Sequence, residues 1–251
     1  MKILFYKPSG HPVLPCGPDC SMMVINSNPT GSTMIGAKNT MPDSIQDPLR
    51  TQSAEPAAAP KKHIPRDPRS VPYGFLKEYD LPDTDIYEDI MLPIAGIRFA
   101  TTGDFAAVAK NHCGAVCASN VLLCLGGGRS SESIFSVMHK MIGNGPVFSL
   151  NRGIKKGARV LGSVVFSERA SSRRDIISAI DRGMPAALLL SNSLFDWHWV
   201  LCVGYRRYPV SVGGKIYLRL VNSWQDSPDT FYLPGEGSRI LSGRAFSALF
   251  E

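Results

Sequence analysis

The stretch NHCGAVCASNVLLCL, residues 111–125, decides the fold of this 251-residue chain. It predicts a helix that begins at Cys113 and ends at the glycine run 126–128. A cysteine in the first turn of a helix lies beside unpaired N–H groups and the positive end of the macrodipole, and both favour thiolate over thiol. Gly114 lets a substrate carbonyl approach the backbone closely. Taken alone, the stretch fits equally well a nucleophile helix and a buried helix that merely contains cysteines.

Two later stretches carry a histidine and an asparagine in suggestive places. DWHWVLCVGY, residues 196–205, puts His198 in an apolar strand, where a buried imidazole needs a partner and a thiolate is one. LVNSW, residues 220–224, puts Asn222 at a strand end, where its side-chain oxygen can orient an imidazole. Singly, a core histidine bonded to backbone and a strand-ending turn are the commoner situations. The order Cys, His, Asn is that of papain-like enzymes.

These motifs resemble the papain-fold cysteine peptidase superfamily, and within it the double-glycine leader peptidases of the bacteriocin-processing type and their stand-alone bacterial relatives. The nucleophile motif CG-x-x-[AC] is matched by CGAVC at residues 113–117, and "DIxxxIDxGxP" by residues 175–185. "HxVxxxGY" is matched at residues 198–205. The resemblance implies an α+β papain-like fold, with the nucleophile helix packed on a mainly antiparallel sheet. It also implies a catalytic triad of Cys113, His198 and Asn222.

Two questions about this site concern the choice of cysteine and the oxyanion donor. Cys113 is preferred to Cys117, because only Cys113 precedes a glycine and lies at the end of the dipole, so Cys117 is expected to pack in the core. Papain-like enzymes carry a glutamine about six residues before the nucleophile, where this chain has Ala107. Asn111 is the candidate replacement as oxyanion donor. Weaker candidates are Thr101 and Thr102.

Proline content divides the chain in two. Thirteen of the 19 prolines fall in residues 1–82, and residues 27–71 are poor in large apolar side chains, which predicts linker or disorder. We therefore expect residues 1–71 to form a largely disordered N-terminal segment, a propeptide or a regulatory arm. Residues 72–251 form the expected papain-like domain. Within the first segment, residues 1–26 are more apolar and suit a strand or a docking element.

The rest of the chain predicts helices first and then strands, an α+β layout. Beyond the first helix, helices are expected at residues 132–142, 151–161 and 172–182, the last with a capping box formed by Ser172 and Asp175. Strands are expected at residues 185–190, 197–205, 215–221 and 230–233.

Composition limits the classes of function. The net charge of +6 comes from scattered basic residues, which argues against nucleic-acid binding, and no apolar run approaches the ~20 residues of a membrane span. Pro8 and Pro12 interrupt the N-terminal apolar stretch, so no secretory signal is evident and a cytoplasmic protein or export by a non-Sec route is expected. The six cysteines suit free thiols, and Cys16 and Cys20 with His11 lack a fourth ligand for a metal site. No metal or cofactor is expected.

The leading hypothesis is thiol-dependent hydrolysis of a peptide or isopeptide bond in a protein or peptide substrate. Acyl or amide transfer, or deamidation, would use the same triad. A catalytically silent papain-fold binding module is the third hypothesis, favoured by the missing glutamine.

Overall fold

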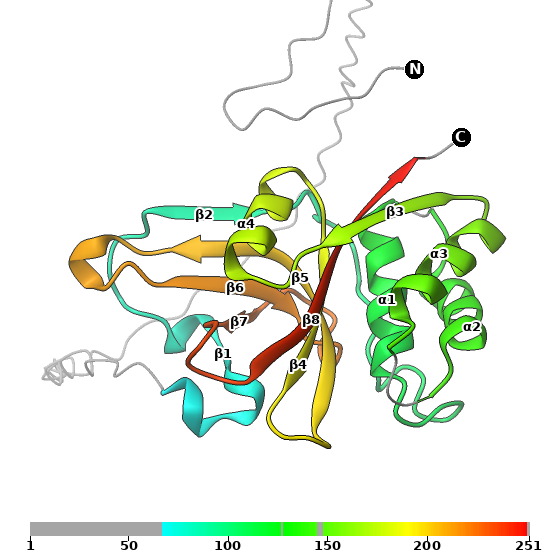
Figure 1. Ribbon diagram of the computed structural model, residues 1–251, viewed down its shortest axis with the longest axis horizontal. Coiled ribbons are helices and arrows are strands. Elements are labelled where there is room, and N and C mark those ends of the chain that lie inside the picture. The colour runs from blue at the N-terminus through cyan, green and yellow to red at the C-terminus, as the bar shows by residue number, and fades with distance from the viewer. Residues whose placement is uncertain (1–66, 127, 145–147, 250–251) are drawn as a thin grey trace, which may run out of the picture. The chain divides into compact units, whose positions relative to one another are not determined.

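The computed structural model describes residues 67–126, 128–144 and 148–249 (Figure 1). Its described part combines a group of helices with one antiparallel sheet, which confirms the expected α+β class. Residues 67–71, assigned above to the N-terminal segment, are among those described, whereas Cys16, Cys20, His11 and residues 1–26 lie outside them. Among the described helices, none has the length and apolar character needed to cross a membrane.

Three helices pack together beside one end of the sheet: α1 (Cys113–Cys124), α2 (Ser131–Ile142) and α3 (Leu150–Val160) (Figure 1). Helix α1 is buried from Gly114 to Leu122, because it lies between the sheet and the other two helices. Helices α2 and α3 approach closely at Gly157, where an added Cβ would collide with the side chain of Met138. This packing fixes the start of α1 against the sheet.

The sheet has eight described strands in the order β1-β7-β6-β5-β4-β8-β3, with β2 pairing beside β5. All pairs are antiparallel. The long β5 is central, because β6 covers one edge while β4 and then β2 cover the other. The strands are β1 (Phe75–Leu76), β2 (Glu88–Met91), β3 (Val164–Arg169), β4 (Ala186–Ser191), β5 (Trp197–Arg207), β6 (Ile216–Val221), β7 (Thr230–Tyr232) and β8 (Arg239–Leu249).

Helix α4 (Arg173–Asp181) is separate from the other three and packs on the sheet (Figure 1). Its capping box is present as expected: Ser172 accepts from the Asp175 N–H, and the Asp175 carboxylate accepts from the Ser172 N–H. The four predicted helices and the four predicted strands are all observed within a few residues of the expected bounds. The sequence did not reveal β1, β2, β3 or β8, so the predicted sheet was too small.

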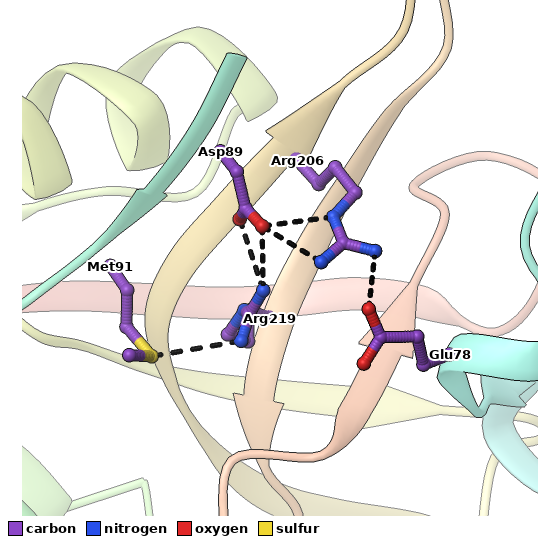
Figure 2. A network of polar contacts seen from close by, with 5 residues as sticks. All are labelled: Glu78, Asp89, Met91, Arg206 and Arg219. Carbon is purple, nitrogen blue, oxygen red and sulfur yellow. Dashed lines mark hydrogen bonds and ion pairs between the residues drawn. The ribbon is translucent and has the colours of Figure 1, made fainter. Parts of the chain in front are cut away.

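A network of ion pairs and hydrogen bonds holds the segment before α1 against strands β5 and β6 (Figure 2). The guanidinium of Arg206, which is almost fully buried, donates to Glu78 Oε1 at 2.9 Å and to Asp89 Oδ2 at 2.7 Å. Arg219 donates to the same Asp89 at 3.0 Å. Both guanidinium groups lie 5.0 Å from the ring centre of Phe231. These contacts hold residues 78–91 against β5 and β6.

Candidate active site

Cys113 is the first residue of α1 and is partly exposed. The backbone N–H groups of Trp199, on β5, of Gly114 and of Cys113 itself act to lower the pKa of its thiol. Burial nevertheless raises the pKa of the Cys113 thiol, and these N–H groups only partly oppose that effect. The N–H groups at the helix start thus favour the thiolate, as expected, but burial is the larger effect and the net shift of the Cys113 pKa is upward.

His198 lies one residue before Trp199 on β5 and is buried. Its Nε2 is 2.6 Å from the main-chain carbonyl oxygen of Asn222. Since a carbonyl only accepts, Nε2 carries the proton, and Nδ1 is the basic atom of the neutral ring. Burial lowers the pKa of His198, while the Asn222 carbonyl and the charge of Asp196 raise it in part. At neutral pH the site therefore pairs a thiol with a neutral imidazole.

The side chain of Asn222 does not make the contact with His198 that the sequence suggested. Its Oδ1 accepts from the N–H groups of Trp224 at 2.9 Å and Gln225 at 3.0 Å. Its Nδ2 donates to Thr230 Oγ1 at 2.9 Å. Asn222 follows β6, and the turn there needs its amide to satisfy N–H groups that the sheet no longer pairs. The orienting acceptor for His198 is thus the backbone of Asn222.

Aromatic rings surround His198. Trp224 stacks on the imidazole with ring centres 4.5 Å apart and planes at 24°. Tyr73 and Phe75, from the segment before α1, lie with ring centres 5.5 Å and 6.4 Å from that of His198. This wall limits access of water to the His198–Asn222 hydrogen bond.

Sequence reasoning missed two polar residues of the site, Tyr73 and Asp196. The Tyr73 hydroxyl donates to Asp196 Oδ1, whose other oxygen accepts from Asn192 Nδ2 at 3.0 Å. Burial raises the pKa of Tyr73, and the hydrogen bond to Asp196 and the charge of that carboxylate raise it further, so the phenol stays protonated. The Tyr73 hydrogen bond and then that of Asn192 lower the pKa of Asp196. Asp196 could have been found from its place two residues before His198.

Tyr73 has no comparable signature in the sequence. It lies 40 residues before Cys113 and has a φ of 54°, a left-handed conformation that is rare for a bulky residue. Its neighbour Gly74 has a φ of 74° and lies so close to Gly237 that a Cβ would not fit between them. Because two consecutive residues are left-handed, the chain turns there and the Tyr73 ring lies beside that of His198.

The two residues just before Cys113, Asn111 and His112, differ in exposure. Asn111 is exposed with a φ of 52°, and its role as oxyanion donor stays a prediction. His112 is 6% exposed, with Nε2 3.0 Å from the carbonyl oxygen of Thr102. Its Nδ1 has no hydrogen-bond partner among the described residues. Ala107, at the position of the missing glutamine, is exposed.

The remaining described cysteines pack in or against the hydrophobic core. Cys117 is fully buried on α1, as predicted, and burial raises its pKa. Burial raises the pKa values of Cys124 and Cys202 to about 12. Among residues 67–126, 128–144 and 148–249 all four cysteines are free, and no cluster of metal-ligating side chains is found.

No family model and no curated protein matches this sequence. Among solved structures, the fold is similar to one described as a "putative C39-like peptidase" from Bacillus anthracis. That match has 10% sequence identity and a TM-score of 0.45, and it covers 65% of this chain and 100% of the other. The function of this chain is therefore argued from its own residues.

Proposed function

We propose that this chain hydrolyses peptide or isopeptide bonds by thiol chemistry, with Cys113 as nucleophile and His198 as base. One observation carries the proposal: α1, which begins at Cys113, packs against β5, which carries His198, and the backbone N–H of Trp199, the residue after His198, lowers the pKa of the Cys113 thiol against the effect of burial. The same proposal includes a domain boundary at residue 71 and a papain-like arrangement of the helices and strands that follow it.

The reaction starts from the neutral pair. As Cys113 Sγ bonds to the substrate carbonyl carbon, His198 Nδ1 accepts the thiol proton, and the carbonyl electron pair moves onto oxygen. The N–H groups at the start of α1 and the side chain of Asn111 are the donors for that oxyanion. The imidazolium then gives its proton to the leaving nitrogen as the C–N bond breaks. A water molecule, deprotonated by His198, releases the acyl group and restores the thiol.

The groups behind His198 suit the charge that develops on it. The Asn222 carbonyl and the Asp196 carboxylate both favour the protonated imidazole, whereas burial opposes it. Burial penalises the imidazolium and not the neutral ring, so its cost arises in the step in which His198 takes up the proton. The stabilisation by Asn222 and Asp196 becomes effective when the proton arrives from Cys113. Asn222 is therefore the third member of the triad in this proposal, acting through its backbone.

The test combines labelling with turnover. A mass-tagged thiol electrophile at neutral pH is applied to the wild type, Cys113→Ala, His198→Gln and Cys124→Ser, the last as a control for a partly buried thiol elsewhere on α1. We expect selective labelling of Cys113 that depends on His198, together with peptide-library cleavage that disappears in Cys113→Ala. Slow labelling of several cysteines, unchanged by His198→Gln and without cleavage, would indicate a silent binding module. Products carrying an added amine would indicate acyl transfer.

A further inference from the structure

A pocket of about 80 Å³ lies between the start of α3 and strands β4, β5 and β8, and Trp199, the residue after His198, is one of its lining residues. Its apolar walls are Leu189, Trp199 and Phe246. A volume of ~10–15 Å³ holds one water molecule, so this pocket holds several waters or one side chain. It is far smaller than the ~300–1,000 Å³ of pockets that take a whole small molecule.

The polar lining of the pocket is suited to an anion. Asn151 comes from α3, whereas Ser242 and Arg244 come from β8. Arg244 is exposed, and its side chain makes no ion pair or hydrogen bond with any residue in the described part of the chain. Its guanidinium can therefore form a bidentate pair with an incoming carboxylate without first breaking an internal one.

The surroundings of the pocket also favour a negatively charged ligand. The first residues of α3, Leu150 and Asn151, line the pocket, and the side chain of the N-cap residue Ser149 makes no hydrogen bond to the first turn. The N–H groups at such a helix start favour a negative group. Between Glu132 and Glu168 the sequence has no acidic residue, but it has five Lys and Arg residues, four of them on α3.

Trp199 connects this pocket to the candidate nucleophile. Trp199 follows His198 on β5 and lines the pocket, and its backbone N–H lowers the pKa of the Cys113 thiol against the effect of burial. Its indole Nε1 is buried and has no hydrogen-bond partner among the described residues. An extended peptide advances ~3.4 Å per residue. A substrate whose carbonyl lies at Cys113 and that extends past Trp199 can therefore bring a nearby side chain to the pocket.

We propose that the pocket binds a carboxylate of the substrate, near the bond that is cut, and so selects acidic peptides. This inference rests on the proposed hydrolase function. The carboxylate can come from an Asp or Glu side chain or from a free peptide C-terminus, and both have the chemistry that Arg244 recognises.

The test is a cleavage assay with matched peptides that carry Asp, Asn, Glu, Gln or Lys at each of the three positions on either side of the bond. We expect kcat/KM at one position to be about 10-fold to 100-fold higher for the acid than for its amide, as for a hydrogen bond between charged groups. Arg244→Gln should abolish this preference and Arg244→Glu should reverse it in favour of Lys. Arg174→Gln, at an exposed position on α4, should leave the acidic preference unchanged. Peptides with amidated and free C-termini distinguish the two sources of carboxylate.

Each result decides one of the two proposals. Cleavage without an acidic preference, or with a preference that persists in Arg244→Glu, overturns the pocket inference and leaves the hydrolase function standing. Absence of any cleavage overturns the hydrolase function. In that case titration calorimetry of Cys113→Ala with the Glu and Gln peptides still tests the pocket, because tighter binding of the Glu peptide must disappear in Cys113→Ala with Arg244→Glu. Equal binding of both peptides overturns it.

Discussion

His198 is oriented by the main chain of Asn222, whose carbonyl oxygen lies 2.6 Å from His198 Nε2. The Asn222 side chain has another task, since its amide binds Thr230 and the turn that follows β6. Replacing the side chain therefore removes no atom of the contact with His198. The role of Asn222 in chemistry and its role in stability can thus be separated.

Asn222→Ala should chiefly lower stability. It leaves the Thr230 hydroxyl and the N–H groups of Trp224 and Gln225 without their partner, at a cost of about 1–3 kcal/mol for buried groups. We expect a lower free energy of unfolding in urea, while the pH dependence of kcat/KM in the folded enzyme stays the same. Asn222→Asp, which keeps the acceptor for both N–H groups, serves as the matched variant and should be less destabilised. A changed pH profile in Asn222→Ala would mean that the side chain itself orients the imidazole.

Alkylation of Cys113 should speed up toward alkaline pH. Burial raises the pKa of the thiol and lowers that of His198, so a thiolate–imidazolium pair is not the resting state. The measurement is the rate of iodoacetamide labelling of Cys113 between pH 5 and 10, read by mass spectrometry of the peptide that contains it. A plateau of high reactivity that extends below pH 6 would show that the ion pair is already formed.

Removing the Asp196 charge should lower the pKa of His198 further. The carboxylate is one of two groups that raise this pKa against the effect of burial. Asp196→Asn keeps an acceptor for Tyr73 and removes the charge. The pKa can be followed by NMR titration of the His198 ring protons, with Asp83→Asn on an exposed turn as the control. A rise in the pKa would contradict the assigned electrostatics.

His198 should also make the protein less stable in acid. Its pKa in the folded protein lies below the ordinary 6.5, so the folded state binds fewer protons than the unfolded state as the pH falls below that value. This contribution to stability is present above pH 6.5 and is lost as the pH falls through the folded pKa. His198→Gln should therefore flatten the acid limb of unfolding free energy against pH. An unchanged slope in that variant would assign the loss to other groups.

The sequence was informative where local rules act and silent where distant segments meet. Helix α4 was predicted because Ser172 and Asp175 form their capping box within four residues. Strand β8 was missed, because Gly243 and Arg244 interrupt its apolar pattern. Yet Gly243 is needed there, since a side chain would collide with the carbonyl of Ala170 on the neighbouring segment. That collision depends on residues more than 70 positions apart and leaves no local trace.

The same division holds for the candidate site. Cys113 and His198 were found from a helix start and from a histidine in an apolar strand, both local features. Tyr73 was not found, because its place beside His198 depends on two left-handed residues and on contacts with Trp224 and Asp196. The net pKa shifts were likewise inaccessible, because burial, which decides their sign, arises only after packing.

Arg206→Ala should destabilise the fold through the network that fastens residues 78–91 to the sheet (Figure 2). The guanidinium is 7% exposed and pairs with both Glu78 and Asp89, so its loss leaves Asp89 with Arg219 alone. Because Glu78 and Asp89 are partly exposed and Asp89 keeps Arg219, the loss is that of hydrogen bonds between charged groups, about 1.5–3 kcal/mol. We expect Arg206→Ala to lower the midpoint of urea unfolding more than Arg219→Ala, whose side chain is more exposed. Arg69→Ala, in a solvent-exposed pair with Asp67, should leave the midpoint where it is. Equal midpoints for Arg206→Ala and wild type would show that the apolar contacts of β2 alone hold this segment.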